Sequence, residues 1–543
     1  MVAVGEGGSM IEAARALGDE ESFRLLAQLV SIAPTNLEDP GHGRWEKPNY
    51  LRASDAIVRA ARAAGLSTRI YDPMVEGDVP GDWHGLARPN VIADLEVGAP
   101  ETVLLMAHYD VVPVPKEQEA RWKTPPHSLT LRRDGRLYGR GSNDDLGSGV
   151  VGSLTALRRL AASGDSPRNG RFLACCDEET GGQGGIEAIR AHDARLPAGD
   201  PGRILVADVA LIPDGSPETI AGSSGLAFLD GSFVRPVPLS EGLAYGDALV
   251  GLHEIARRWR SVYASPDWPD RHAPEPVITG RATVTQFDVR ATSSEAARIR
   301  LLAAHAETDA PNQLPRAVTL VFSGPAPELE RLRERLAPLV SPPFRLEPAG
   351  PTALSVAPGS LALQLIGEAT HAGYPHRGHN PVPPALLLLR AACDRALVDP
   401  GTLGTVTYAV DFRLIPEMEL EVGLAAGLSY LRSWVATHAP SARIEAPPER
   451  CRSGYALPVD HPATRKLARI LEATFGVHGV YGEYGGTDAS ALRDLRTPRG
   501  EPLPALVFGS MEPDSHIHDA EESSDPRKIA AVAASIERFV REP

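Results

Sequence analysis

The stretch LLMAHYDVVPVP, residues 104–115, is the point from which both the fold and the chemistry of this 543-residue chain can be inferred. Its apolar residues are typical of a strand that is buried on both faces. The apolar run is interrupted by His108 and, two positions later, by Asp110. Taken alone, the pair is better explained as a core histidine with a hydrogen-bonding neighbour, so its meaning depends on the rest of the chain.

Strand-like and helix-like segments alternate around this stretch. Short apolar segments occur at residues 90–97, 102–108, 171–179 and 208–214, and helical patterns occur at residues 21–32, 50–66 and 147–163. Such alternation predicts an α/β fold with a mostly parallel sheet that is flanked by helices. Active sites of such sheets lie beyond the carboxyl ends of the strands.

The pattern changes after about residue 223. Segments typical of strands with one exposed face occur at residues 225–236, 282–293, 317–324, 361–373 and 405–416, with helical segments between them. This order predicts an α+β, ferredoxin-like domain, although its length is about twice that of one small domain. The α/β pattern returns near residue 436. We therefore predict one domain formed by residues 1–223 and 431–543, with a second domain, residues 224–430, inserted into it.

The composition excludes several classes of protein. The net charge of −15 argues against nucleic-acid binding, which needs a basic surface, and no polybasic segment is present to hold an anionic membrane. No segment approaches the roughly 20 continuous apolar residues of a membrane span, and no secretory signal is evident. The four cysteines lack zinc-ribbon spacing, which favours a cytoplasmic protein. We expect neither nucleic acid nor membrane as a partner.

Acidic residues and histidines recur where the predicted strands of the first domain end. They follow one another at intervals of about 35 residues, the length of one strand–helix–strand unit, which predicts that they meet at one edge of the sheet. Carboxylates gathered in this way repel one another unless cations bind between them. A mixture of histidine and carboxylate suits zinc, and also manganese or cobalt. The candidates are His108, Asp144, Asp145, Asp177, Glu178, Glu179 and Asp214, with His516 or His518 as a further ligand.

Other catalytic signatures are absent from the sequence. It contains neither the Gly-x-Ser-x-Gly motif of a serine nucleophile nor a His-Glu-x-x-His motif. The segment GRGSND begins like a dinucleotide-binding loop, but Asp144 stands where the third glycine of that loop should be.

A series of short motifs runs through most of the chain. MAHYDVVP, LYGRGSNDDLGSG, DEETGG and PDG follow one another in this order, and GEATHAGYPHRGHNP, VDFRLIP, YGGTDAS and HDAEE come after them. Together these motifs resemble the di-zinc aminoacylase and metallopeptidase family, and jointly they are highly specific. That family includes acetylornithine deacetylase, succinyl-diaminopimelate desuccinylase, glutamate carboxypeptidase and carnosinase-type dipeptidases.

The resemblance implies a site for two divalent metal ions, with zinc expected and manganese or cobalt as alternatives. Asp144 would bridge the two ions and would be joined to Asp145 by a cis peptide. The remaining ligands would be His108 and Asp214 for one ion, and Glu179 and His518 for the other.

His518 is preferred to His516 because family members carry an acid four positions after this ligand, and Glu522 occupies that position. The family usually has lysine after the pair of acids, where this chain has Leu146. This departure leaves the metal ligands intact but puts the packing of the loop or the substrate preference in doubt.

The resemblance also assigns the catalytic residues. Glu178 would be the general base, which takes a proton from a water that bridges the metal ions and returns it to the leaving nitrogen. Asp110 would hydrogen-bond the imidazole of His108 and thereby orient it.

The inserted domain resembles the lid, or dimerisation domain, of the family. His371 matches a lid histidine that stabilises the oxyanion. Arg413 matches an arginine that holds a substrate carboxylate. Further candidates for contacts to the substrate are Asn312, Gly486 and Thr487.

We therefore expect a metal-dependent hydrolase that cleaves the amide bond of short peptides, as a dipeptidase or carboxypeptidase does. The double-length insert favours the dipeptidase-like branch, in which it either mimics a dimer partner within one chain or enlarges the interface of a homodimer. One alternative is an N-acyl-amino-acid deacylase with the same mechanism, and a second is a catalytically silent binding protein. The substrate would be a small peptide or an N-acyl amino acid.

Overall fold

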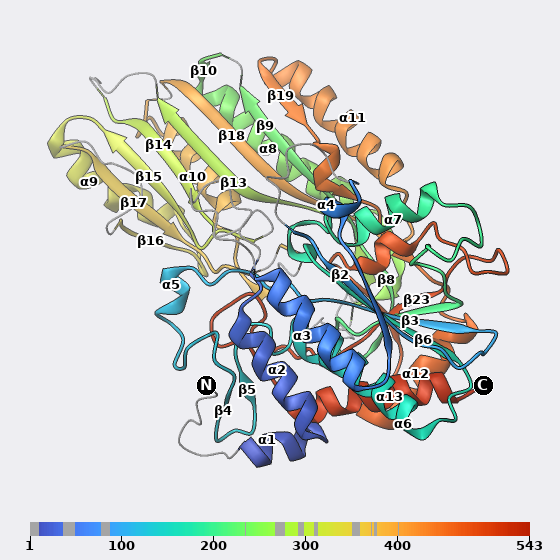
Figure 1. Ribbon diagram of the computed structural model, residues 1–543. Helices are drawn as coiled ribbons and strands as arrows, with labels where there is room; N and C mark the ends of the chain where they lie inside the picture. Colours follow the sequence, from blue (N-terminus) through green and yellow to red (C-terminus); the bar gives the residue numbers. More distant parts are fainter. Residues whose placement is uncertain are drawn as a thin grey trace. The chain divides into compact units, whose positions relative to one another are not determined.

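The computed structural model describes residues 10–35, 49–77, 87–233, 235–265, 277–291, 298–308, 313–349, 359–370, 372–373, 377–399 and 401–543. The chain divides into two compact units (Figure 1). Unit 1 comprises Met1–Gly222, Tyr455–Gly482 and Thr487–Pro543, and unit 2 comprises Ser223–Gly454 and Glu483–Gly486.

Unit 1 is built on a mixed sheet whose centre is parallel. Within the described residues the sheet has nine strands, and β6, β3, β7 and β23 form its parallel part. The neighbours on either side, β2 and β8, pair antiparallel. The predicted α/β class is thus confirmed, with antiparallel edges added. The strands, in sheet order, are β1 (Ser67–Tyr71), β2 (Asn90–Leu95), β6 (Asn169–Cys175), β3 (Thr102–His108), β7 (Val209–Ile212), β23 (Ala505–Val507), β8 (Thr219–Ser223) and β21 (Tyr455–Ala456), with β22 (Val480–Glu483) paired to β8.

Helices cover this sheet, because its central strands are apolar on both faces. In β3, every residue from Val103 to His108 is buried, which leaves neither face for solvent. Packing between helices closes the layer around α13, which contacts α1, α6 and α12. The helices are α1 (Met10–Leu17), α2 (Glu20–Ile32), α3 (Tyr50–Ala63), α6 (Ser153–Ser163), α7 (Ile186–Arg195), α12 (Pro462–Phe475) and α13 (Pro526–Arg541), with the short helices α4 (Pro73–Glu76) and α5 (Lys116–Glu119).

A small three-stranded sheet joins two segments that are far apart in sequence. Its central strand, β5 (Leu137–Tyr138), pairs with β4 (Thr130–Leu131) on one side and with β24 (Ser523–Ser524) on the other. The pairing brings the segment after His518 beside the loop that carries Asp144. Two of the predicted ligands are therefore positioned by this sheet.

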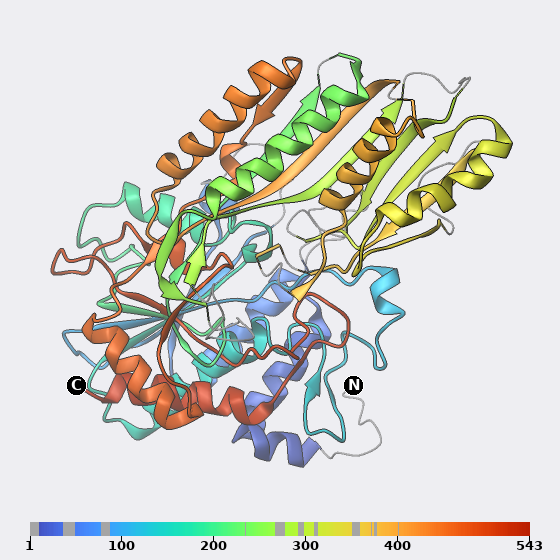
Figure 2. The same ribbon diagram turned by 180° about the vertical axis from the view of Figure 1, so that it is seen from behind.

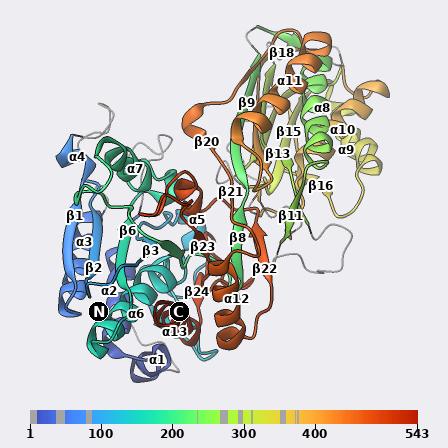
Figure 3. The same ribbon diagram turned by 90° about the vertical axis from the view of Figure 1, so that its right-hand side faces the viewer.

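Unit 2 is an antiparallel sheet with helices on one face. Within the described residues the sheet has ten strands, and seen nearly edge-on in Figure 3 all four long helices lie on the same side. Figure 2 shows these helices across that face. In sheet order the strands are β16 (Arg345–Pro348), β17 (Leu361–Ile366), β15 (Ala317–Ser323), β14 (Arg300–Glu307), β13 (Arg281–Ala291), β18 (Thr402–Leu414), β9 (Gly225–Phe233) and β19 (Ala442–Glu445), with β10 (Val237–Pro238) beside β18 and β20 (Cys451–Arg452) beside β9.

The predicted ferredoxin-like pattern occurs twice in unit 2. The first half follows the chain order β9, α8 (Leu239–Ala256), β13, β18, α11 (Leu420–His438), β19, and its sheet order is β13-β18-β9-β19. The second half, with α9 (Ala326–Leu336) and α10 (Val382–Asp394), has the matching order β16-β17-β15-β14. In this half the edge strand β14 precedes the others in the chain, so the second half is a circular permutation of the first. The antiparallel pair β13–β14 joins the halves into one sheet.

Unit 2 extends past residue 430, where the sequence pattern placed the return to the first domain. Helix α11 packs on α8 and β9, and β19 and β20 add to the edge at β9. This segment therefore completes the first half of unit 2, and the chain re-enters unit 1 at Tyr455.

All four cysteines are free, and Cys175 and Cys176 lie in the core of unit 1. Among the helices that the structure describes, none has the length and apolar character needed to cross a bilayer.

Candidate metal centre

His108 is the last residue of β3, and its ring orientation is fixed by the chain that follows. Its Nδ1 lies 3.0 Å from the backbone oxygen of Asp110. Because a carbonyl oxygen can only accept a hydrogen bond, Nδ1 carries the proton. Nε2 is then the nitrogen that a metal ion can reach by displacing its proton, and it points at Asp144, whose Oδ1 is 3.1 Å away. This is the tautomer that a metal ligand requires.

Asp144 lies in the crossover between β3 and β6, immediately before the π-helix η1 (Leu146–Gly152). The regular spacing of the acids predicted that Asp144 follows a strand of the main sheet. The strand that precedes it is β5, which belongs to the small three-stranded sheet. Its peptide bond to Asp145 is cis, as the resemblance implied. Asp145 caps η1: its Oδ1 accepts the N–H of Gly149 at 2.7 Å.

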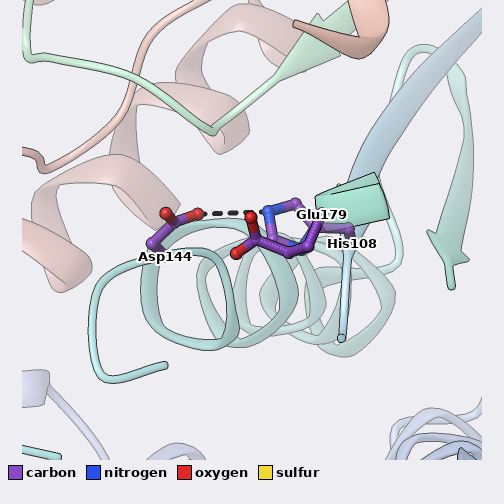
Figure 4. Close-up of side chains that lie close together, drawn as sticks. All are labelled: His108, Asp144 and Glu179. Atoms are coloured by element: carbon purple, nitrogen blue, oxygen red, sulfur yellow. Dashed lines mark hydrogen bonds and ion pairs between the residues drawn. The ribbon is translucent and has the colours of Figure 1, made fainter. Parts of the chain in front are cut away.

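The two carboxylate oxygens of Asp144 face two different histidines. Oδ1 lies 3.1 Å from Nε2 of His108, and Oδ2 lies 3.0 Å from Nε2 of His518. On the first side, Oδ2 of Asp214 is 3.9 Å from Nε2 of His108. On the second side, Oε2 of Glu179 is 3.1 Å from Nε2 of His518. Figure 4 shows His108, Asp144 and Glu179 converging from separate segments. The five predicted ligands thus form two half-sites that share Asp144.

The turn after β6 carries two adjacent glutamates, Glu178 and Glu179, in the 3-10 helix η2 (Glu178–Thr180). The carboxylate of Asp110 accepts both backbone N–H groups, from Glu178 at 3.1 Å and from Glu179 at 3.2 Å. Its Oδ1 is 3.6 Å from Nδ1 of His108, which is beyond hydrogen-bond length. The sequence predicted that the side chain of Asp110 orients His108. The backbone oxygen of Asp110 accepts the hydrogen bond of the ring, while the carboxylate lies beside the same nitrogen, raises the pKa of His108 and also holds the glutamate turn. The role of this carboxylate in orienting the ring stays a prediction.

Burial and the neighbouring charges shift the pKa values of the groups in this cluster. Burial raises the pKa of Glu179 to about 7, against the opposing charge of His518. Burial and the charges of Asp145, Asp144 and Glu178 raise the pKa of Asp214. Burial lowers the pKa of His108, but its carboxylate neighbours outweigh burial and leave that pKa well above the usual value. Without cations, the cluster therefore holds protons near neutral pH.

The donor set fits divalent metal ions. Imidazole nitrogen and carboxylate oxygen together suit zinc, manganese or cobalt, and one carboxylate oxygen is directed at each half-site. Within the described residues, ligand atoms converge closely enough for a metal ion in His108, Asp144 and Glu179, and also in His108, Asp145 and Asp214. The second group includes Asp145, which the sequence left without a role. The feature of the sequence that could have indicated this role is the position of Asp145 next to Asp144, the predicted bridging ligand.

The loop that carries His518 is tied to the Asp144 loop by a buried ion pair. Oε2 of Glu522 accepts Nη1 of Arg140 at 2.7 Å, and Oε1 of Glu522 accepts the backbone N–H of Asp144 at 3.3 Å. Arg140 also donates to Gln118 at 2.7 Å, and Gln118 donates to the backbone oxygen of His518 at 2.9 Å. The sequence pointed to Glu522 but missed Arg140, whose side chain is as buried as that of its partner.

Of the residues predicted to contact the substrate, Arg413, Gly486 and Thr487 are among those that the structure describes. In unit 2, the guanidinium of Arg413 donates to both oxygens of Asp411, at 2.7 and 2.8 Å, and to the backbone oxygen of Tyr484 at 3.1 Å. Its predicted role toward a substrate carboxylate stays a prediction, and Asp411 would compete for it. In unit 1, Thr487 accepts the N–H of Ala489 at 2.9 Å and thereby caps the 3-10 helix η6 (Asp488–Leu492). Gly486 has open space around its Cα. His371 and Asn312 lie outside the described residues.

Comparison with known families agrees with this arrangement. Residues 104–542 match the family described as Peptidase family M20/M25/M40. Because this match covers most of the chain, the protein belongs to that family, and the resemblance drawn from the motifs is confirmed.

Individual relatives are similar over shorter stretches. The human N-fatty-acyl-amino acid synthase/hydrolase is 48% identical over 82 residues, 15% of this chain and 15% of its own length. The cysteinylglycine-S-conjugate dipeptidase of Corynebacterium striatum is 37% identical over 119 residues, 22% of this chain and 24% of its own length. Across the curated relatives considered, the matched part spans between 15% and 39% of the relative's length.

A solved structure is similar over the whole fold. The crystal structure of human carnosine dipeptidase 1 matches 98% of this chain and 99% of its own, with a TM-score of 0.54 at 15% sequence identity. At this identity the match supports the fold of both units and nothing finer.

Removal of the shared carboxylate is expected to empty both half-sites. Asp144→Ala should bind neither of the two metal ions expected per chain, because the ligands of each half-site then lose their common oxygen donor. Asp214→Ala should lose one ion and keep the other. Metal content after dialysis, measured by plasma mass spectrometry, distinguishes these outcomes. Asp494→Ala, at an exposed aspartate outside the cluster, is the matched control. Retention of two ions by Asp144→Ala would contradict the shared-ligand geometry.

Metal affinity is expected to fall in acid. In the metal-free protein Glu179 has a pKa of about 7, so below that pH its carboxyl holds a proton that a metal ion must displace. The Kd for cobalt should therefore rise by more than about tenfold for each pH unit below 7, because the histidine ligands, whose pKa values are also raised, give up protons as well. Isothermal titration at pH 6, 7 and 8, in buffers of different ionisation enthalpy, measures both the Kd and the protons released. A Kd that is constant over this range would contradict the raised pKa.

Proposed function

We propose that the protein is a metal-dependent hydrolase that cleaves the amide bond of short peptides with a free carboxylate, in the manner of a dipeptidase. The observation that carries this proposal is the carboxylate of Asp144, which offers one oxygen to each of two histidine-containing half-sites. Membership of Peptidase family M20/M25/M40 supports hydrolysis as the reaction class.

The residues of the site would have two kinds of role, metal ligand and general base. His108 and Asp214 would hold one metal ion, Glu179 and His518 the other, and Asp144 both. Bound there, two divalent ions would lower the pKa of a water held at the site and polarise the scissile carbonyl. Glu178 would take the proton of the attacking water and deliver it to the leaving nitrogen, so that the proton is conserved over the cycle.

The position of Glu178 suits this task. It precedes a metal ligand in the same turn, and its backbone N–H is held by Asp110. Its charge acts on Asp214, so its carboxylate is within electrostatic reach of the opposite half-site. A general base must lie close to the water it activates, and the place of Glu178 in this turn, one residue before a predicted metal ligand, supports that role.

Two features support a dipeptidase. A stretch of this chain is 37% identical to a bacterial cysteinylglycine-S-conjugate dipeptidase. The doubled sheet of unit 2 also fits the double-length insert that favoured the dipeptidase-like branch.

The second candidate is hydrolysis of N-acyl amino acids, which the 48% identity over 82 residues to the human N-fatty-acyl-amino acid synthase/hydrolase favours. A screen of dipeptides and N-acyl amino acids under zinc, manganese and cobalt separates the two. Turnover of acyl substrates alone would favour the second candidate. Absence of both bound metal and turnover would favour a silent binding protein.

Glu178→Gln should keep both metal ions and lose turnover. An amide cannot accept the proton of the attacking water, so kcat should fall by about 10²–10⁴-fold with little change in KM. Steady-state kinetics and metal content are measured on the same sample. Glu187→Gln, on helix α7 and paired with Arg190, is the matched control and should behave as wild type. A Glu178→Gln enzyme with kcat within about tenfold of wild type would remove Glu178 from this role.

We also propose that the protein acts as a monomer, because one chain contains both ferredoxin-like halves. The outer strands of the unit 2 sheet, β16 and β19, are only four residues long and carry charged residues, and β16 ends in proline. Such edges resist pairing with another sheet. Light scattering coupled to size exclusion should give 57.8 kDa, the mass of one chain. A mass of twice that value would favour the homodimer.

A further inference from the structure

The turn that carries Glu178 and Glu179 begins with a third acid, Asp177, whose carboxylate belongs to a buried network with Arg88 and Tyr50. Asp177 is 3% exposed and has a left-handed backbone, with φ of 60°. One of its oxygens accepts Nε of Arg88 at 2.6 Å, and the other accepts the hydroxyl of Tyr50 at 2.9 Å. Both partners are buried and come from segments outside the cluster.

The two donors of this network are themselves held firmly. The ring of Tyr50 packs edge-on against Tyr109, with centroids 5.5 Å apart, and Tyr109 donates to the backbone oxygen of Pro89 at 2.5 Å. The guanidinium of Arg88 lies 5.7 Å from the centre of the Tyr50 ring. Tyr50 and Arg88 are therefore fixed in relation to each other and to the residue that follows His108.

The chain after the turn leaves room for this network because it has a glycine, Gly184, where a side chain would collide with it. A Cβ at Gly184 would lie 2.4 Å from Oδ2 of Asp177 and 2.8 Å from Cδ of Arg88. Asn90 spans the same turn, because its side chain accepts the N–H of Cys176 at 3.2 Å and donates to the oxygen of Gly184 at 2.8 Å. The turn therefore packs tightly against the ion pair of Asp177 and Arg88.

The glutamate turn is consequently held from two sides. On the metal side, the carboxylate of Asp110 accepts the N–H groups of Glu178 and Glu179. On the opposite side, Arg88 and Tyr50 hold Asp177. Arg88 also supplies a positive charge to the first of three consecutive acids, which would otherwise repel one another. A buried ion pair adds little net stability compared with apolar packing, so stability alone does not account for it.

We infer that Arg88, Tyr50 and Asp177 are positioning residues, which set where the proton acceptor Glu178 and the metal ligand Glu179 stand. None of the three touches the reacting atoms. Their effect on turnover rests on the proposed function, whereas their effect on the geometry of Glu179 does not.

The test uses Tyr50→Phe, which removes one hydroxyl and keeps the ring, and Arg88→Lys, which keeps the charge but changes the donor geometry. Tyr71→Phe is the matched control, since Tyr71 is a buried tyrosine of the same unit whose hydroxyl donates to the backbone oxygen of Ala188. For the full-length chain loaded with cobalt, we measure kcat, KM, the visible cobalt spectrum, cobalt stoichiometry and the melting temperature.

Tyr50→Phe should lower kcat roughly tenfold, leave KM within about twofold, keep the cobalt stoichiometry and shift the cobalt absorption bands. Arg88→Met should lower kcat further, and Arg88→Lys should recover part of that loss. Tyr71→Phe should match wild type in kcat and in spectrum. If Tyr50→Phe and Arg88→Lys change only the melting temperature, the network is structural and the inference is wrong.

The proposed function can fail separately. If wild type hydrolyses none of the substrates, the reaction class is wrong, but the cobalt spectra of the same variants still decide whether the network positions Glu179. A shifted spectrum in Tyr50→Phe beside an unchanged one in Tyr71→Phe supports the inference, and two unchanged spectra overturn it.

Discussion

The repulsion among buried carboxylates is the constraint on which the rest of unit 1 depends. Asp144, Glu179 and Asp214 lie around two histidines with little water to screen them, and their pKa values are shifted by burial and by one another. A fold that gathers such charges must hold each by covalent geometry and by hydrogen bonds. Three features restrain these side chains. They are the parallel centre of the sheet, the cap of Asp145 on η1, and the hydrogen bonds of Asp110 to the glutamate turn. Two divalent cations would balance the charge that the fold cannot neutralise alone.

The chain supplies this restraint through groups that are not among the predicted metal ligands. Asp110 holds two backbone N–H groups, Glu522 holds the peptide of Asp144, and Arg88 with Tyr50 holds Asp177. In each case a buried polar group is satisfied by a neighbour from a different segment, as buried polar groups must be. The precision of the site therefore comes from the packing behind it. Outer partners of this kind commonly set the affinity and activity of metal sites.

The sequence predicted which side chains gather at the site, but not the contacts that hold them, and both outcomes have physical reasons. His108 and Asp214 follow β3 and β7, which are parallel neighbours, so strand ends were enough to bring them together. Asp144 lies between the two histidines as the sequence predicted, but its regular spacing does not reflect a strand of the main sheet. The roles of Asp110, Arg140 and Arg88 depend on rotamers and on contacts between distant segments. No local pattern encodes such contacts. The doubled architecture of unit 2 was visible only as excess length, since a permuted second half leaves no repeat in sequence.

The pairing of β5 with β24 has a consequence for biosynthesis. Leu137–Tyr138 pairs with Ser523–Ser524, and Asp144 faces His518, so one side of the predicted metal centre forms only after the long intervening segment, which includes Ser223–Gly454 of unit 2, has been translated. Contacts of such long sequence separation form late, after local structure is in place. A nascent chain that has not reached His518 therefore offers a metal ion His108, Asp144, Glu179 and Asp214, but not the second histidine. Occupancy of a site that needs His518 would therefore follow the synthesis of unit 2, and the metal supply at that later moment would decide it.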